Sequence, residues 1–171
     1  NKFDLKVQTK SFDEGEDSIT KVALVGRPNV GKSSILNRLL SEERALVSNV
    51  PGTTRDNIDT FLNYNGKPYL IIDTAGIRRP SKVKEEIETA SVGRSLRAID
   101  RADVVIIVVD ADNGIVDQDA RLINLAVKRF KPVLLIVNKW DLITSKGANT
   151  QEKYRSNLRS KSLKDMSFIP I

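Results

Sequence analysis

Cysteine, histidine and long apolar runs are all absent from this sequence. Without cysteine the chain can form neither a disulfide scaffold nor a thiolate metal site. Without histidine it cannot use an imidazole as a catalytic base or as a metal ligand. No run approaches the ~18 apolar residues of a membrane helix, and no signal peptide is visible, so no membrane partner is expected. Any metal must be a hard cation held by oxygen atoms.

The overall composition is typical of one globular domain. Hydrophobic residues make up 40% of the 171 residues and charged residues 29%. The net charge of +6 suits an anionic partner such as RNA, although a solvated lysine-rich surface would give the same total. Residues 1–20 are polar and acid-rich, which predicts a tail or linker before a domain at 21–171. Because the chain begins at Asn1 rather than Met, we expect a fragment or a processed form.

Apolar runs and amphipathic segments alternate from residue 21 onward. The run at 21–25 predicts a buried strand, and residues 33–40 carry Ile35, Leu36, Leu39 and Leu40 at helical spacing. The stretch 57–73 alternates around Asn65-Gly66, which predicts an antiparallel hairpin with a type I′ turn.

The second half of the chain has the same character. The runs at 104–110 and 133–138 are rich in β-branched residues, which predicts strands covered on both faces. Between them, residues 117–130 predict a helix, and residues 92–102 are a further helix candidate. The last residues, 168–171, predict a short strand that is cut off at the terminus. The helix at 117–130 is expected to bury one face formed by Leu122, Leu125, Ala126 and Phe130.

Strands that alternate with helices predict an α/β fold of the P-loop NTPase class. We expect a doubly wound, mostly parallel, six-stranded sheet with one antiparallel hairpin strand. Ligands of such sheets bind beyond the carboxyl ends of the strands. The polar residues that follow each apolar run are therefore the candidate site residues.

The stretch "GRPNVGKSS" at 26–34 follows the first strand and fits the pattern G-x-x-x-x-G-K-S. Backbone N–H groups of such a loop converge on phosphate oxygens, and the following helix dipole adds attraction. Lys32 would contact the β- and γ-phosphates, and the Ser33 hydroxyl would bind Mg²⁺. The predicted nucleotide-binding residues of this loop are Asn29, Val30, Gly31, Lys32, Ser33 and Ser34.

The stretch "LIIDTAGIRRP" at 70–80 places Asp73 at the end of a strand. A carboxylate there can hold Mg²⁺ through water, and Gly76 can direct a backbone N–H toward the γ-phosphate. An isolated aspartate at such a position would as readily be a turn or cap residue. The arginines 78 and 79 could touch RNA or enter the site, but such pairs are more often solvated. The basic cluster "KRFK" at 128–131 has the same two interpretations.

The stretch "NKWD" at 138–141 follows another apolar run. The carboxylate of Asp141 can accept hydrogen bonds from N1–H and the 2-amino group of guanine, which adenine cannot offer. Asn138 and the stem of Lys139 would support the loop and cover the base. The sequence therefore predicts a guanine nucleotide.

The stretch "VPGTTRD" at 50–56 lies between the first helix and the hairpin. A threonine there can close over Mg²⁺ and the γ-phosphate. We favour Thr54, with Thr53 as the neighbouring candidate, and an ordinary Pro-Gly turn is the alternative.

Together these motifs resemble the Der (EngA) family of tandem GTPases, which help to assemble the large ribosomal subunit. The resemblance covers about residues 21–143, and "RALVSNVPGTTRD" with "DTAGIRRPSKV" is most similar to the family's second G domain. It implies hydrolysis of GTP to GDP with Mg²⁺, with Lys32, Thr54 and Gly76 as catalytic residues. Era-type and tRNA-modification GTPases, which act as RNA-binding regulatory modules, share these forms less completely and are the alternative.

The resemblance also sets limits on what this chain contains. The family has a Ser-Ala-Leu-like motif after its last strand, a first G domain and a C-terminal KH-like domain. None of the three is present here, so the base pocket is expected to be incomplete and the other domains to be partners. We expect GTP to order the segments 44–57 and 74–90, which then bind ribosomal RNA, protein or a neighbouring domain. The expected location is bacterial cytoplasm, or the stroma or matrix of an organelle.

Ile77 occupies the position where many GTPases have a water-orienting glutamine. The resemblance implies a hydrophobic-substituted group in which K⁺, held by Asn29, supplies positive charge to the transition state. We therefore expect slow hydrolysis that K⁺ stimulates. The alternative role for Asn29 is to shape the loop.

Overall fold

The computed structural model describes residues 19–41, 45–49, 59–74, 77, 87–144, 147 and 149–171. In chain order the elements are β1 (Thr20–Val25), α1 (Lys32–Ser41), β2 (Ala45–Asn49), β3 (Thr60–Tyr64), β4 (Lys67–Ile72), α3 (Ile87–Arg101), β5 (Val104–Asp110), α4 (Asp117–Lys128), β6 (Val133–Asn138), the short 3₁₀ helix η1 (Trp140–Leu142) and α5 (Thr150–Lys161).

The strands form one six-stranded sheet in the order β2-β3-β4-β1-β5-β6. β1 pairs in parallel with β4 and with β5, and β5 pairs in parallel with β6. Only β3 runs against its neighbours, because it is antiparallel to both β2 and β4. The predicted sheet class is thereby confirmed, and the carboxyl ends of β1, β4, β5 and β6 share one edge.

The hairpin between β3 and β4 turns where the sequence predicts. Tyr64 pairs with Lys67, and the two residues between them are Asn65 and Gly66. Their φ angles of 51° and 78° are both positive, as a type I′ turn requires.

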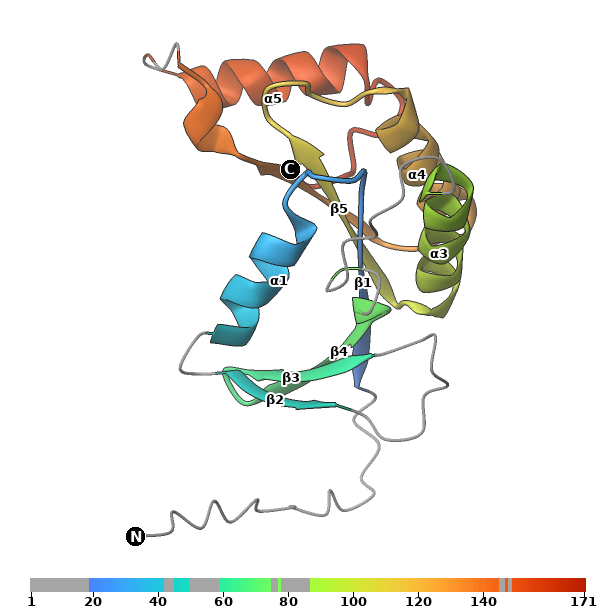
Figure 1. Cartoon of the computed structure of the whole chain (residues 1–171). Helices are drawn as coiled ribbons and strands as arrows, with labels where there is room; N and C mark the ends of the chain where they lie inside the picture. Colours follow the sequence, from blue (N-terminus) through green and yellow to red (C-terminus); the bar gives the residue numbers. More distant parts are fainter. Residues whose placement is uncertain are drawn as a thin grey trace, which may run out of the picture.

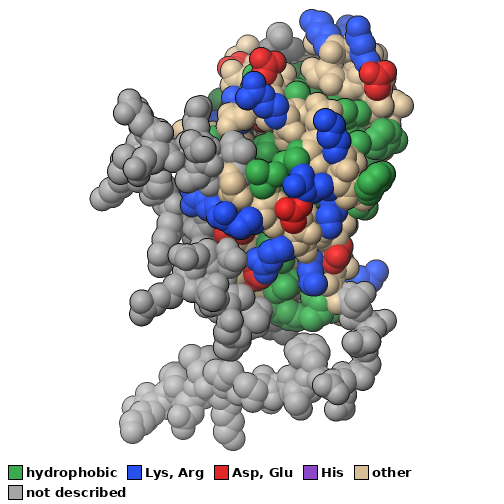
Figure 2. Space-filling view, turned by 90° about the vertical axis from the view of Figure 1, so that its right-hand side faces the viewer, with side chains coloured by type: hydrophobic (Ala, Val, Ile, Leu, Met, Phe, Trp, Pro, Cys, Tyr) green, Lys and Arg blue, Asp and Glu red, His purple; other side chains and the backbone are tan. Residues whose placement is uncertain are grey.

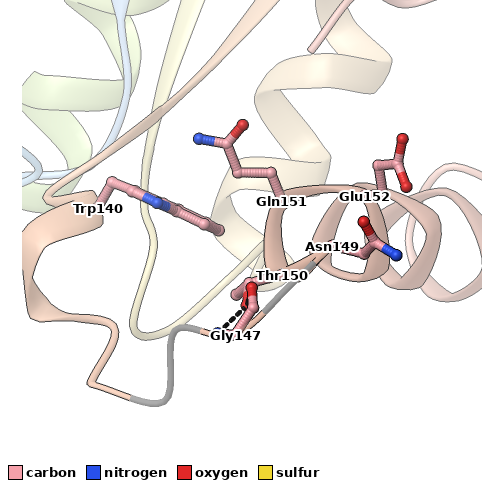
Figure 3. A pocket seen from close by; sticks show the side chains of 6 residues that line it. All are labelled: Trp140, Gly147, Asn149, Thr150, Gln151 and Glu152. Carbon is pink, nitrogen blue, oxygen red and sulfur yellow. Dashed lines mark hydrogen bonds between the residues drawn. The ribbon is translucent and has the colours of Figure 1, made fainter.

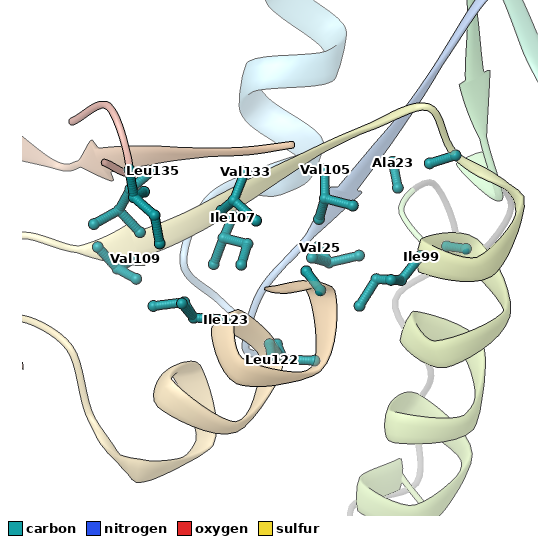
Figure 4. Close-up of a cluster of buried hydrophobic side chains, with 14 of the residues drawn as sticks. Ala23, Val25, Ile99, Val105, Ile107, Val109, Leu122, Ile123, Val133 and Leu135 are labelled. Atoms are coloured by element: carbon teal, nitrogen blue, oxygen red, sulfur yellow. The ribbon is translucent and has the colours of Figure 1, made fainter. Parts of the chain in front are cut away.

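Alternate residues of the central strands face two separate apolar clusters. Ala23 and Val25 of β1 belong to the larger cluster, which β5 shares with α3 and α4 (Figure 4). Leu158 of α5 belongs to the same cluster. Val22 and Leu24 belong to the smaller cluster, which contains Leu36 of α1. The sheet therefore carries α1 on one face and α3 and α4 on the other (Figure 1).

The strands at the two edges of the sheet differ from the prediction. Residues 168–171 are not a strand: the backbone N–H of Leu135 donates to the Pro170 carbonyl at 3.0 Å, but no ladder follows. The sixth strand is β2 instead, which pairs with β3 from Ala45↔Tyr64 to Asn49↔Thr60. Residues 45–49 are too short a run to show a clear alternating pattern, so the sequence alone does not predict β2. Its pairing with β3 of the hairpin identifies it as a strand.

The helices also depart from the prediction in detail. α4 ends at Lys128, and Phe130 lies beyond it, 94% exposed, so its assignment to the buried face was wrong. Four apolar residues were predicted at helical spacing in α1, and of these only Leu36 is fully buried. α5 was not predicted, because it is largely polar and buries only Leu158.

None of the helices in the described part of the chain has the length and hydrophobicity needed to span a bilayer.

Replacing Ile123 by alanine should destabilise the fold by about 2–5 kcal/mol. Ile123 is 1% exposed and packs between α4 and the sheet, so truncation removes apolar contacts and leaves a cavity. Urea unfolding gives the change in free energy. The matched control is Asn124→Ala at the next, exposed position, for which we expect a change within about 0.5 kcal/mol. Equal losses for both variants would contradict this view of α4.

Candidate nucleotide-binding site

The loop between β1 and α1 passes very close to neighbouring strands. A β-carbon on Gly26 would lie 2.4 Å from the carbonyl oxygen of Val108 in β5, and its φ is 147°. A β-carbon on Gly31, with φ of 97°, would lie 2.1 Å from Nδ2 of Asn138. Both positions therefore require glycine. Between them, Asn29 has φ of 64°, a left-handed conformation that asparagine tolerates better than most residues.

Lys32 begins α1 and folds its side chain back over this loop. Its Nζ donates to the carbonyl oxygens of Gly26 at 2.8 Å and Arg27 at 2.6 Å. Burial lowers the pKa of Lys32 from 10.5 to about 8, and the negative charge of Asp119 acts in the opposite direction. The ammonium thus lies inside the loop, where a phosphate group could replace the carbonyls as its partner.

Ser33 and Ser34 follow in the first turn of α1, and both are exposed. This turn contains no acidic residue, so the positive end of the helix dipole is not neutralised there. Its backbone N–H groups have no intrahelical acceptors. The start of α1 is therefore suited to an anion.

Asp73 follows directly after the last residue of β4, with φ of 55°. Its backbone N–H donates to Oδ1 of Asp59 at 3.0 Å, and the Asp59 carboxylate, 2% exposed, also pairs with Arg101 of α3. The hydroxyls of Thr60 and Thr74, both fully buried, lie 2.8 Å apart. The start of β3 thus holds the end of β4 through side chains that the sequence analysis missed.

The residues after β6 contact the β1–α1 loop. Nδ2 of Asn138 donates to the Val30 carbonyl oxygen at 2.8 Å. Lys139 has φ of 60°, and its Nζ donates to Oδ2 of Asp110 at 2.7 Å. This hydrogen bond is the main cause that lowers the pKa of Asp110, and a bond from the N–H of Asp112 adds to it. Asp141, in η1, is exposed.

A second tie fixes the loop to α4. Nε of Arg27 lies 3.1 Å and 3.0 Å from the two carboxylate oxygens of Asp119, which is fully buried. Oδ2 of Asp119 also accepts from the N–H of Val116. Sequence analysis missed this pair, because the partners are 92 residues apart and no local pattern connects them.

Ile77 is half-buried and packs against the smaller apolar cluster, so its hydrophobic character has a packing role. The predicted residues Thr53, Thr54 and Gly76, and the arginines 78 and 79, lie outside the described residues.

A hollow of about 430 Å³ lies beside the 138–141 loop, between Trp140 and the start of α5 (Figure 3). Trp140 meets the ring of Tyr154 edge-on, with centroids 5.1 Å apart. The Tyr154 hydroxyl donates to the Ala111 carbonyl oxygen at 2.7 Å. α5 is thereby fixed to the loops after β5 and β6. None of the described residues that line the hollow belongs to the phosphate-binding pattern at 26–34.

The described site residues therefore gather at the carboxyl edge of the parallel strands. The β1–α1 loop, Asp73, and the 138–141 loop follow β1, β4 and β6. The contact between Asn138 and Val30 shows that the first and the last of these meet. The edge combines backbone N–H groups, an ammonium and carboxylates, which can bind a phosphate chain with a cation.

Comparison with known proteins agrees with this geometry. Residues 21–139 match the family model described as 50S ribosome-binding GTPase. GTPase Der of Clostridium perfringens is 50% identical over 160 residues, which are 94% of this chain and 35% of the relative. GTPase Der of Fusobacterium nucleatum is 47% identical, covering 94% of this chain and 36% of the relative. The chain thus spans little more than a third of these relatives.

Era, in a solved structure in complex with MgGDPNP and nucleotides 1506–1542 of 16S ribosomal RNA, is 30% identical in sequence to this chain. It superposes with a TM-score of 0.62 over 90% of this chain and 50% of that one. The fold is accordingly that of a P-loop GTPase G domain. The chain belongs to the 50S ribosome-binding GTPase family, within which its sequence is similar to GTPase Der.

Proposed function

We propose that this chain binds GTP with Mg²⁺ and hydrolyses it to GDP and phosphate, as a nucleotide switch in the assembly of the large ribosomal subunit. The observation that carries the proposal is the hydrogen bond between Asn138 and the Val30 carbonyl oxygen. It joins the loop suited to phosphates to the loop suited to guanine. Family membership and the similarity to GTPase Der support the same activity.

The residues present fit the nucleotide and its metal. Lys32 and the N–H groups of the 29–34 stretch would bind the phosphates, while Asn138, Lys139 and Asp141 would bind the base. Ser33 and Asp73 offer two oxygen ligands of the kind Mg²⁺ prefers, and the nucleotide's phosphates would supply others. Bound Mg²⁺ would neutralise charge that develops on the phosphates. Thr54 and Gly76 are assigned to the γ-phosphate on the sequence motif alone.

For hydrolysis, the chain's own contribution is positioning and charge. Lys32 is held over the loop, so its ammonium is already oriented toward the place of the phosphates. Backbone N–H groups at the start of α1 would stabilise the negative charge that develops as water attacks the γ-phosphate. Ile77 cannot orient that water, so we expect a slow intrinsic rate.

The ribosomal part of the proposal rests on relatives and on charge. The family description names the 50S subunit, and the net charge of +6 suits RNA. In a longer protein this chain would be the second G domain, beside another G domain and a KH-like domain. The relatives named above are bacterial, so we propose the bacterial cytoplasm as its location. The Era structure with ribosomal RNA favours, as second candidate, an Era-like RNA-binding module.

Asp141→Asn should exchange guanine for xanthine specificity. An amide inverts the hydrogen-bond pattern that guanine requires, so GTP affinity should fall and xanthosine triphosphate affinity rise. Calorimetry with Mg²⁺ and GTP, ATP or xanthosine triphosphate measures this. The unaltered chain should prefer GTP over ATP by about 10⁴-fold. The same preparations are also sedimented with large ribosomal subunits. The unaltered chain should bind the subunits when GTP is present, and the variant should bind them when xanthosine triphosphate is present. Comparable ATP binding would refute the guanine site, and association independent of nucleotide would refute the switch.

The affinity for GDP should fall as pH rises above 8. The pKa of Lys32 is lowered to about 8, so the ammonium that binds phosphate is lost through that pH. Between pH 7.5 and 9 the loss should be roughly eight-fold. Lys32→Arg keeps its charge across this range and reports any titration of the base itself. An equal loss in both proteins would show that Lys32 is not the titrating group.

Hydrolysis should be faster in K⁺ than in Na⁺ at equal ionic strength. Positive charge added at the transition state is worth up to about 10³–10⁵ in rate, and Asn29 is the proposed ligand of the ion. Asn29→Gly removes the amide but suits the backbone φ of 64°, so it should abolish the difference while the loop keeps its shape. Phosphate release measures both rates. Equal rates in the two salts would overturn the role of K⁺.

A further inference from the structure

The chain leaves α4 through a turn that favours glycine but contains phenylalanine. The N–H of Phe130 donates to the Val127 carbonyl oxygen at 2.9 Å. The N–H of Lys131 donates to the Ala126 carbonyl oxygen at 3.0 Å. These two bonds define a Schellman turn, in which the residue after the C-cap adopts a left-handed backbone. Phe130 has φ of 55°, where a β-carbon costs stability and glycine would not.

The same residue exposes its ring almost completely. Phe130 is 94% exposed, compared with 66% for Phe168 and 51% for Leu142. A single exposed apolar side chain is ordinary on a protein surface. An aromatic ring that is both exposed and placed on a strained backbone contributes little to folding, and such positions cluster at functional sites.

Basic residues flank Phe130 in the sequence. Lys128, Arg129 and Lys131 are its neighbours in sequence, and Lys128 lines a hollow of about 460 Å³ on α4 together with Arg121, Asn124 and Leu125. Among the described residues, neither Arg121 nor Lys128 takes part in an ion pair. Lysine and arginine side chains outnumber acidic ones over the face that carries α3 and α4 (Figure 2).

The acidic residues near this region are already engaged. Asp100 of α3 forms an ion pair with Arg129. Oδ2 of Asp103 accepts from the backbone N–H of Lys21 at 2.8 Å. Nζ of Lys131 donates to the Ala102 carbonyl oxygen at 2.6 Å, which holds this lysine against the end of α3. Of the basic residues in this region, Arg121, Lys128 and Lys131 form no ion pair with a described residue.

The position in the fold separates this surface from the nucleotide loops. Phe130 and Lys131 are separated from β6 by Pro132 alone, and the Pro132 carbonyl oxygen accepts from the N–H of Val105 at the start of β5. The nucleotide loops follow the opposite ends of the strands. A partner at Phe130 would therefore leave the phosphate-binding loop accessible.

We propose that Phe130, with Lys128 and Arg121, binds single-stranded RNA: a base stacks on the exposed ring, and phosphates further along the same strand contact Lys128 and Arg121 on α4. Stacking of bases on aromatic side chains between cations is how proteins bind single strands. A hydrophobic protein partner would need a contiguous apolar patch, whereas the sequence neighbours of Phe130 are charged. The inference deepens the proposed function, since it assigns an RNA contact to a surface outside the nucleotide site.

The test is Phe130→Gly in the 171-residue chain. Glycine suits the left-handed backbone, so thermal unfolding should occur at the same or a higher temperature. Affinity for a fluorescein-labelled 12-nucleotide oligouridine, measured by anisotropy, should fall by roughly 5- to 150-fold. Phe130→Tyr, which keeps the stacking face, should bind like the unaltered chain. Lys128→Gln should weaken binding and flatten its dependence on salt.

Phe168→Ala is the matched control, because among the described residues Phe168 is the other phenylalanine with a largely exposed ring. It should leave the oligouridine affinity unchanged. The inference is overturned if the unaltered chain does not bind the oligonucleotide, if Phe130→Gly binds it equally well, or if Phe168→Ala weakens it as much. GDP affinity, measured in the same preparations, should be unaffected by Phe130→Gly. A chain that bound RNA through Phe130 but bound no guanine nucleotide would refute the proposed function and leave this inference standing.

Discussion

The hydrogen bond from Asn138 to the Val30 carbonyl oxygen is the constraint on which the nucleotide edge depends. It joins residues 108 apart in the chain, and it forms only because Gly31 has no side chain in the path of the asparagine amide. The loop that follows β1 and the loop that follows β6 are thereby held in one arrangement. A site that must recognise both ends of a long ligand needs such a fixed separation, because each loop alone would lose binding energy to its own ordering.

Side-chain ties to the surrounding helices support this arrangement. Arg27 connects the loop after β1 to Asp119 at the start of α4, and Asp59 connects the end of β4 to Arg101 at the end of α3. Both aspartates are nearly inaccessible to water, so each charge depends on its arginine partner and on the backbone N–H group that donates to it. The packing of α3 and α4 on the sheet and the geometry of the edge are therefore interdependent.

Much of the fold could be predicted because the pattern of apolar residues is local. Continuous runs identified β1, β5 and β6, and Asn65-Gly66 fixed the hairpin, since its positive φ angles follow from residue type. β2 and α5 were missed because their stability comes from neighbours rather than from their own patterns. The phosphate and base motifs were found in sequence, whereas the ties of Arg27 and Asp59 could not be, because each needs partners that only folding brings together.

Among the described residues other than glycine that have a left-handed backbone, only Lys139 and Phe130 are neither asparagine nor aspartate. Lys139 adopts this conformation in the loop after β6, where its Nζ forms an ion pair with Asp110. Phe130 accepts it at the opposite edge, where glycine would form the same turn without the penalty of about 1–2 kcal/mol. The described contacts of its side chain provide no comparable compensation, since the ring is almost wholly in water. A strained backbone at Phe130 that does not stabilise the fold is what we expect of a residue that is retained for binding.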